Sequence, residues 1–219
     1  MGIAFQREIE IPLPGIQLKG DLTIPQGAEA MVVFSHGSGS SRFSPRNRQV
    51  ATYLNRHKLG TLLIDLLTED EDTLYANRFD ISLLTRRLAG ATEFLKELVI
   101  TRDLHIGYFG ASTGAASALR AAAFLPYICA VVSRGGRPDL AMEALPKVNA
   151  PTLLIVGSLD YTVIELNRQA YKVMTCTKSM EIIDGASHLF EEKGTLDKVA
   201  EAATHWFQKY LTTAKVAHQ

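Results

Sequence analysis

The sequence predicts an α/β fold, with a mostly parallel sheet of about eight strands between two layers of helices. Segments typical of strands and of helices alternate along most of the chain, which implies right-handed crossovers between parallel strands. The strand-like segment at residues 30–35 (AMVVFS) is a short apolar run, as expected for a strand covered on both faces. From residue 81 to residue 98, apolar residues recur at steps of three and four, which indicates an amphipathic helix.

The expected strands begin with an antiparallel pair, because Pro14-Gly15 is a turn signal between the first two. In chain order, strands are expected at residues 5–11, 16–24, 30–35, 61–65, 105–109, 128–133, 152–156 and 180–183. Ser44 before Pro45 predicts an N-cap followed by proline at the first helical position. Helices are expected from Pro45 to a stop near Gly60, and then at residues 81–98, 115–124, 164–174 and 196–211.

Composition narrows the class of protein. The 219 residues contain no repeat or linker, which predicts a single domain over residues 1–219. Lys plus Arg equals Asp plus Glu at 23 each, so neither nucleic acid nor a membrane surface is expected as a partner. Cys129 and Cys176 show no disulfide or metal-site spacing. No signal peptide and no apolar run of the ~20 residues that cross a bilayer is apparent, so a cytoplasmic location is expected.

The loop after the fifth expected strand carries the main functional motif. Residues 110–114 read Gly-Ala-Ser-Thr-Gly, a Gly-x-Ser-x-Gly pattern between a strand and a helix. A serine in such a turn adopts a strained backbone conformation, and side chains two positions away on either side would collide. The turn places the Ser112 hydroxyl at a helix N-terminus, where backbone N–H groups favour negative charge. We therefore interpret Ser112 as a catalytic nucleophile.

A serine hydroxyl needs a base that removes its proton. The six histidines are His36, His57, His105, His188, His205 and His218. With this type of turn the chain order is serine, acid and then histidine, which leaves the last three as candidates. His205 falls within the C-terminal helix and His218 within the terminal tail. His188, in a loop just after the last strand, is the predicted base.

The acid of the triad must orient His188 and stabilise its cation. Asp160 leaves the end of the seventh expected strand, from which its carboxylate can face His188. Asp139, after the sixth strand, is the alternative acid, although we expect it to be a helix N-cap. Asp184 is too near the base in sequence to reach round the imidazole ring easily. Asp160 is therefore the predicted acid.

Acyl transfer also requires two hydrogen-bond donors for the oxyanion. The backbone N–H of Thr113, the residue after the nucleophile, is expected to be one of them. The other is expected from the glycine-rich loop at residues 36–41, with Ser38 as the donor. His36 is expected only to brace this loop.

Arginines gather in the loops that follow the third and sixth strands, namely Arg42, Arg46, Arg134 and Arg137. Ligands bind at the carboxyl edge of such sheets, and arginine forms bidentate hydrogen bonds to carboxylate or phosphate. Arg134 follows its strand most directly, so it is the candidate to bind an anionic group of the substrate, with Arg42 as a further candidate. The alternative, which we favour, is that these arginines pair with Asp139, Asp80 or Glu192, or lie in solvent.

With these motifs in place, the chain resembles the α/β-hydrolase superfamily, and most of all its small dienelactone-hydrolase-like group. It also resembles the hydrolase module that some bacterial proteins fuse to a phosphoribosyltransferase. The stretches that carry the likeness are HGSGSSRFSPRN, GYFGASTGAASAL, SRGGRPDL, PTLLIVGSLD and GASHLFEE. The resemblance implies the α/β-hydrolase fold and hydrolysis. Dienelactone hydrolases use a cysteine nucleophile where this chain has Ser112, so the resemblance leaves the substrate open.

The expected reaction is therefore hydrolysis of a small carboxylic ester or lactone through an acyl-enzyme, with no cofactor and no metal. The short segment between residues 133 and 152 leaves no room for a cap domain, which favours a small or flexible substrate. An acyltransferase, thioesterase or amidase could use the same triad. A non-catalytic binding module on this fold is a further alternative, although all three triad members are present.

Overall fold

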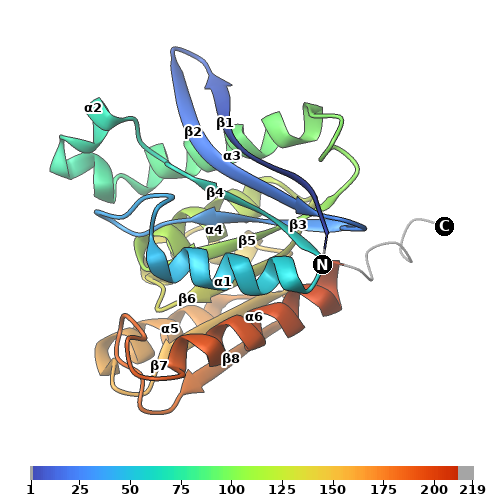
Figure 1. The fold of residues 1–219 in the computed structure, drawn as a ribbon. Helices are drawn as coiled ribbons and strands as arrows, with labels where there is room; N and C mark the ends of the chain where they lie inside the picture. The colour runs from blue at the N-terminus through green and yellow to red at the C-terminus, as the bar shows by residue number, and fades with distance from the viewer. Residues whose placement is uncertain (1, 212–219) are drawn as a thin grey trace.

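An eight-stranded sheet runs through the centre of the molecule, with helices on both faces (Figure 1). The computed structural model describes residues 2–211. The strands are β1 (Ile3–Leu13), β2 (Ile16–Pro25), β3 (Ala30–Ser35), β4 (Leu59–Ile64), β5 (His105–Ala111), β6 (Ile128–Arg134), β7 (Thr152–Gly157) and β8 (Lys178–Ile183). They lie in the order β1-β2-β4-β3-β5-β6-β7-β8, antiparallel where β2 pairs with β1 and β4 and parallel elsewhere. The predicted mostly parallel sheet is confirmed.

The helices form two layers, which explains why the central strands are apolar on both faces. They are α1 (Pro45–Arg56), α2 (Glu69–Asp72), α3 (Ile81–Glu97), α4 (Thr113–Phe124), α5 (Tyr161–Val173) and α6 (Thr195–Leu211). In β3, Val32 and Phe34 pack in the core beneath α1 and α6. Met31 and Val33, which point the opposite way, pack in the core beneath α3 and α4.

Several element boundaries differ from those predicted. Ser44 caps α1 as expected, by accepting a hydrogen bond from Asn47 N–H, but the helix ends at Arg56. Lys58 takes a left-handed conformation, with φ of 61°, which turns the chain directly into β4. Gly60, the predicted helix stop, therefore lies inside β4, where it pairs with Met31.

The connection between β6 and β7 contains two short 3₁₀ helices, η2 (Pro138–Ala141) and η3 (Leu145–Lys147). A third, η1 (Tyr75–Phe79), follows α2, and neither of these two elements was predicted. The connection is too short for a cap domain, in agreement with the prediction. No helix within residues 2–211 is long and apolar enough to cross a membrane.

The core on the α1 and α6 side depends on Phe207, which is fully buried in α6. Its ring fills the space over Gly107 of β5, where an added Cβ would lie 2.9 Å from Phe207 Cε1. We expect Phe207→Ala to lower the free energy of unfolding by about 3–5 kcal/mol, because truncation leaves a cavity. Phe124→Ala is the matched control, since Phe124 is 60% exposed at the end of α4. Urea unfolding of both variants tests this, and equal losses would contradict the packing described.

Candidate active site

The turn between β5 and α4 holds Ser112 in a backbone conformation that few residues adopt. Its φ is 51° and its ψ is −123°, an arrangement that costs roughly 1–3 kcal/mol in a residue with a side chain. Close backbone contacts on both sides keep the turn tight. A Cβ on Gly110 would lie 2.4 Å from Ala115 Cα, and one on Gly114 would lie 2.2 Å from the Ser35 carbonyl oxygen. Both glycines of the motif are therefore required by packing.

The loop after β3 runs directly against this turn. A Cβ on Gly37 would lie 3.1 Å from Ser112 Cβ and 3.8 Å from Ser112 Oγ. The next residue, Ser38, donates its backbone N–H to Thr113 Oγ1 at 2.8 Å. This hydrogen bond occupies the N–H group that was predicted to bind the oxyanion directly. The contact was not foreseen, because it joins two loops that are far apart in the sequence.

His36 braces the same loop, as expected. Its Nε2 accepts the backbone N–H of Leu66 at 3.1 Å, so its proton must lie on Nδ1, which donates to the Gly37 carbonyl at 2.9 Å. Burial lowers the pKa of His36 below its usual value, and the imidazole stays neutral. The loop beside Ser112 is thus tied to the chain that follows β4.

Asp160 and His188 meet at the ends of β7 and β8. His188 Nδ1 donates to Asp160 Oδ2 at 2.6 Å. The two loops are held together by the Leu159 N–H, which donates to the Ala186 carbonyl at 3.0 Å. Asp160 is the N-cap residue of α5 but makes no capping hydrogen bond, so its carboxylate is available to the imidazole. With Nδ1 engaged, Nε2 is the nitrogen that can act as a base.

The segment after β6 lies between Ser112 and His188. The Ser112 N–H donates to the Arg134 carbonyl at 3.2 Å, and the Arg137 N–H donates to the Ser112 carbonyl at 3.0 Å. Gly135, in the same segment, lies next to His188, since a Cβ added to it would be 3.6 Å from His188 Cε1. The serine and the imidazole therefore border the same few residues. Within the described residues, no hydrogen bond joins Ser112 Oγ to His188.

The other candidates for acid and base lie elsewhere. Asp139 accepts two hydrogen bonds from the Arg137 guanidinium, at 2.9 and 2.8 Å, which raise the pKa of Arg137. The expectation that Asp139 is a helix N-cap was wrong, because Arg137 holds that position in η2. His205 lies on α6 and His218 lies outside the described residues.

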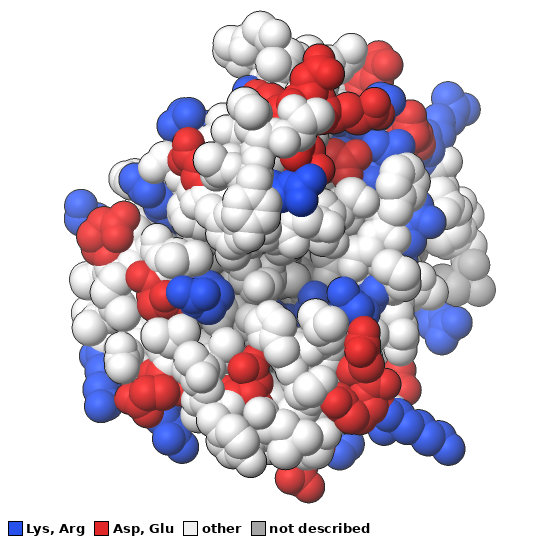
Figure 2. Space-filling view, turned by 90° about the vertical axis from the view of Figure 1, so that its left-hand side faces the viewer, with Lys and Arg blue, Asp and Glu red and all other residues white. Residues whose placement is uncertain are grey.

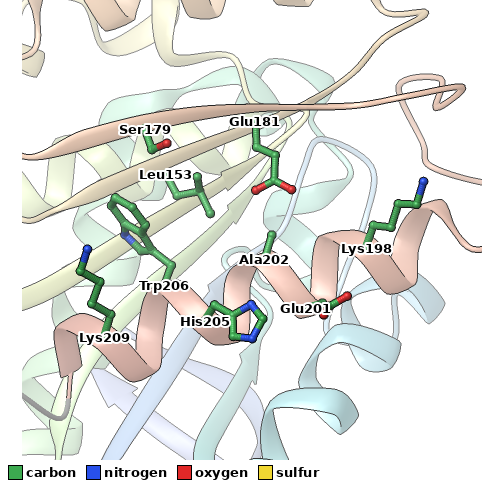
Figure 3. Close-up of a pocket in the computed structure, with 9 residues that line it drawn as sticks. All are labelled: Leu153, Ser179, Glu181, Lys198, Glu201, Ala202, His205, Trp206 and Lys209. Atoms are coloured by element: carbon green, nitrogen blue, oxygen red, sulfur yellow. The ribbon is translucent and has the colours of Figure 1, made fainter.

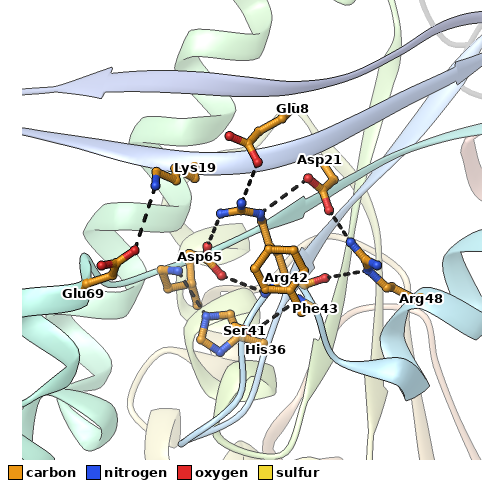
Figure 4. A network of polar contacts seen from close by, with 11 residues as sticks. Glu8, Lys19, Asp21, His36, Ser41, Arg42, Phe43, Arg48, Asp65 and Glu69 are labelled. Carbon is orange, nitrogen blue, oxygen red and sulfur yellow. Dashed lines mark hydrogen bonds and ion pairs between the residues drawn. The ribbon is translucent and has the colours of Figure 1, made fainter.

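Arg42 belongs to a network of ion pairs that joins the loop after β3 to β1, β2 and the end of β4 (Figure 4). Its guanidinium reaches Glu8 and Asp65, both at 2.6 Å, and Asp21 at 3.4 Å. The side chain is 6% exposed, and Phe43 stacks on it at 4.3 Å. Three carboxylates already surround this cation, which agrees with the alternative that it forms ion pairs and not a substrate contact.

Arg134, the last residue of β6, is in contrast a buried cation for which no acidic partner is recorded among the described residues. Its Nη2 donates to Asn47 Oδ1 at 3.3 Å, while its Nε has no hydrogen-bond partner there. The guanidinium carbon lies 5.9 Å from the centre of the Phe190 ring. Burial, together with the neighbouring charge of Arg46, lowers the pKa of Arg134 to about 10, so it remains protonated at neutral pH.

The surface at the carboxyl ends of the parallel strands is hollowed near its centre, and basic side chains border the hollow (Figure 2). A second depression, of about 350 Å³, lies between β8 and α6 (Figure 3). Its walls include Glu181, His205 and Trp206, and none of its lining residues comes from the loops that carry Ser112, Asp160 or His188. The predicted catalytic residues therefore lie outside this second depression.

Comparison with known proteins identifies close relatives, although no protein-family model matches the chain. A crystal structure of a dienelactone hydrolase from Anabaena variabilis is 52% identical, with a TM-score of 0.92, over 94% of this chain and 98% of that one. A Mycobacterium tuberculosis protein, whose name contains the words phosphoribosyl transferase, is 50% identical over 205 residues. This match covers 93% of the chain and 46% of the relative, so the chain spans about half the length of the curated relatives it matches.

More distant solved structures share the fold. Est1E from Butyrivibrio proteoclasticus is 17% identical with a TM-score of 0.79, over 92% of this chain and 98% of that one. An esterase domain from a Rhodothermus marinus protein is 17% identical with a TM-score of 0.77, over 94% and 99%. At this identity the likeness concerns the fold alone. The identity and coverage of the Anabaena structure go further, and the chain belongs to the dienelactone-hydrolase family of α/β hydrolases.

Proposed function

We propose that the protein is a serine hydrolase that cleaves small carboxylic esters or lactones through an acyl-enzyme. The observation that carries the proposal is the 2.6 Å hydrogen bond between His188 and Asp160, next to the strained Ser112 turn. A carboxylate that orients an imidazole beside a serine at a helix N-terminus is the arrangement that acyl transfer requires. Strain at Ser112 supports the same view, because backbone strain concentrates at functional sites.

In the proposed reaction, His188 Nε2 accepts the Ser112 proton while Ser112 Oγ bonds to the substrate carbonyl carbon. The Thr113 N–H, in the first turn of α4, has no intrahelical acceptor and can bind the oxygen that becomes negative. His188 then gives the proton to the leaving alkoxide, and Ser112 keeps the acyl group. Water attacks the acyl-serine with His188 again as base, which releases the acid and restores the serine.

Residues 2–211 form no cap domain, which favours small or flexible acyl groups. Thioesters, amides and transfer to acceptors other than water would use the same residues, and a screen across these substrate classes separates them. A binding module on this fold is the remaining alternative. A fluorophosphonate probe distinguishes it from an enzyme, since only an activated serine becomes labelled.

We expect Ser112→Ala to abolish hydrolysis and fluorophosphonate labelling while the protein stays folded, because the change removes the hydroxyl without opening a cavity. A loss on the order of 10⁶ in kcat corresponds to removal of a triad nucleophile. Turnover of p-nitrophenyl acetate, probe labelling and circular dichroism together test this. Ser82→Ala, on α3, is the matched control. Activity of Ser112→Ala within tenfold of the wild type would show that Ser112 is not the nucleophile.

The acid is tested by comparing Asp160→Asn with Asp139→Asn. Loss of the Asp160 charge is expected to lower kcat by up to ~10⁴, because the imidazole is no longer held in the productive orientation. Asp139→Asn weakens only a pair with Arg137, and we expect it to cost less than about 1 kcal/mol of stability with little effect on rate. A reversed order of the two effects on kcat would make Asp139 the acid.

We further propose that the substrate carries an anionic group held by Arg134. A buried guanidinium without a carboxylate partner is costly, and an anionic ligand would offset that cost. The observations that support this are the unpartnered Nε and the position of Arg134 directly beside the Ser112 turn. Arg134 is 7% exposed, so the anion would bind in a largely desolvated position.

This proposal predicts that esters bearing a free carboxylate are preferred over matched neutral esters. Arg134→Met keeps an unbranched apolar stem without the charge, and is expected to erase the preference by raising KM for the anionic ester alone. Arg168→Met, which removes an exposed charge on α5, should leave the preference intact. Equal kcat/KM for the two esters in the wild-type enzyme would contradict the proposal that Arg134 binds an anionic group of the substrate.

A further inference from the structure

The hydroxyl of Thr113, the residue after Ser112, is bonded to the loop after β3 and has no part in the mechanism proposed above. Its oxygen accepts the Ser38 N–H at 2.8 Å. A hydroxyl also has one proton to donate, and no acceptor for that proton is found among the described residues. Thr113 is only 4% exposed. A buried hydroxyl proton without an acceptor is unfavourable, which points to an acceptor that arrives with the substrate.

The surroundings define where that acceptor would lie. Thr113 directly follows Ser112, and Gly37 approaches Ser112 Oγ from the same loop that supplies the Ser38 N–H. The backbone N–H and the side-chain hydroxyl of Thr113 belong to one residue at the start of α4. Both groups therefore belong to the residue adjacent to the one whose Oγ would bond to the substrate carbon.

The Ser38 loop is held firmly in this arrangement. His36 bonds both to Leu66 N–H and to the Gly37 carbonyl, and the Ser40 N–H closes a turn onto that same carbonyl at 3.1 Å. While Ser38 donates to Thr113 Oγ1, it cannot aim the same N–H at the substrate. A hydrogen bond received by a hydroxyl oxygen also makes the hydroxyl a stronger donor.

We propose that Thr113 is a catalytic residue whose hydroxyl is the second hydrogen-bond donor to the oxyanion. The Ser38 N–H donates to that hydroxyl and does not contact the substrate itself. This inference rests on the proposed serine hydrolase mechanism. As Ser112 Oγ bonds to the carbonyl carbon, the carbonyl π electrons move to oxygen, and Thr113 O–H donates a hydrogen bond to that oxygen. No proton leaves Thr113, and the proton of Ser112 passes to His188.

Thr113→Val tests the proposal, because valine keeps the shape of threonine and removes the hydroxyl. We expect kcat for p-nitrophenyl acetate to fall by about 10²–10³ with little change in KM, which is the effect of losing one oxyanion donor. Thr113→Ser restores the hydroxyl and should recover most of that loss. Thr204→Val is the matched control, since Thr204 is a buried threonine on α6 whose hydroxyl donates to the Ala200 carbonyl at 2.7 Å.

A second readout separates a donor to the oxyanion from a merely structural threonine. Sulfur is a weaker hydrogen-bond acceptor than oxygen, so the wild-type enzyme should prefer p-nitrophenyl acetate over its thiono analogue. That preference should shrink in Thr113→Val and return in Thr113→Ser. Thr113→Ala gives the same comparison if the valine variant does not fold.

A Thr113→Val enzyme with kcat within threefold of the wild type, or faster, would overturn the proposal. The Ser38 N–H would then reach the substrate itself, and the hydroxyl would only occupy its place in the free enzyme. An unchanged oxygen-to-sulfur preference would overturn it as well. Either result, together with an inactive Ser112→Ala, leaves the serine hydrolase mechanism standing, whereas an active Ser112→Ala removes that mechanism first.

Discussion

The whole site depends on the close contact between the start of α4 and the end of β3. Gly114 lies so near the Ser35 and His36 carbonyls that an added Cβ would be 2.2 and 2.4 Å from them. This contact positions three groups at once, because the strained Ser112, the first N–H groups of α4 and the loop through Gly37 all meet there. The strain at Ser112 can persist because the neighbouring β5 and β3 strands are buried and leave the turn no other path.

The parallel strands bring the remaining components to the same edge. β5 delivers Ser112, β7 delivers Asp160 and β8 delivers His188, each in the loop after the strand. The residues of the loop after β6 bridge the gap between the serine and the imidazole through backbone contacts. Asp160 and His188 are 28 positions apart in the chain, and they meet because β7 and β8, the strands that precede them, are neighbours in the sheet.

Local rules allowed much of this arrangement to be predicted. The order of strands and helices, the cap at Ser44 and the need for Gly110 and Gly114 follow from patterns within a few residues. Patterns within a few residues did not predict several contacts between side chains and loops that are far apart in the sequence. The Ser38 bond to Thr113 and the three carboxylates around Arg42 depend on which loops the fold brings together, and so does the lack of a carboxylate at Arg134 within residues 2–211. The ion pair of Asp139 with Arg137 was among the alternatives for the arginines, whereas the cap role of Asp139 was wrong because a bidentate ion pair competes with the capping preference of aspartate.

The carboxylates around Arg42 come from β1, β2 and the end of β4, whereas Arg42 itself stands in the loop that continues from Ser38 to α1. The antiparallel β1-β2 hairpin therefore does more than extend the sheet at one edge. Through a buried cation it joins the loop beside Ser112, and local opening of that loop would expose the cation and separate it from the hairpin. We therefore expect the hairpin and the loop to unfold as one cooperative unit, so that the order of the candidate site is shared with the strands at this edge of the sheet.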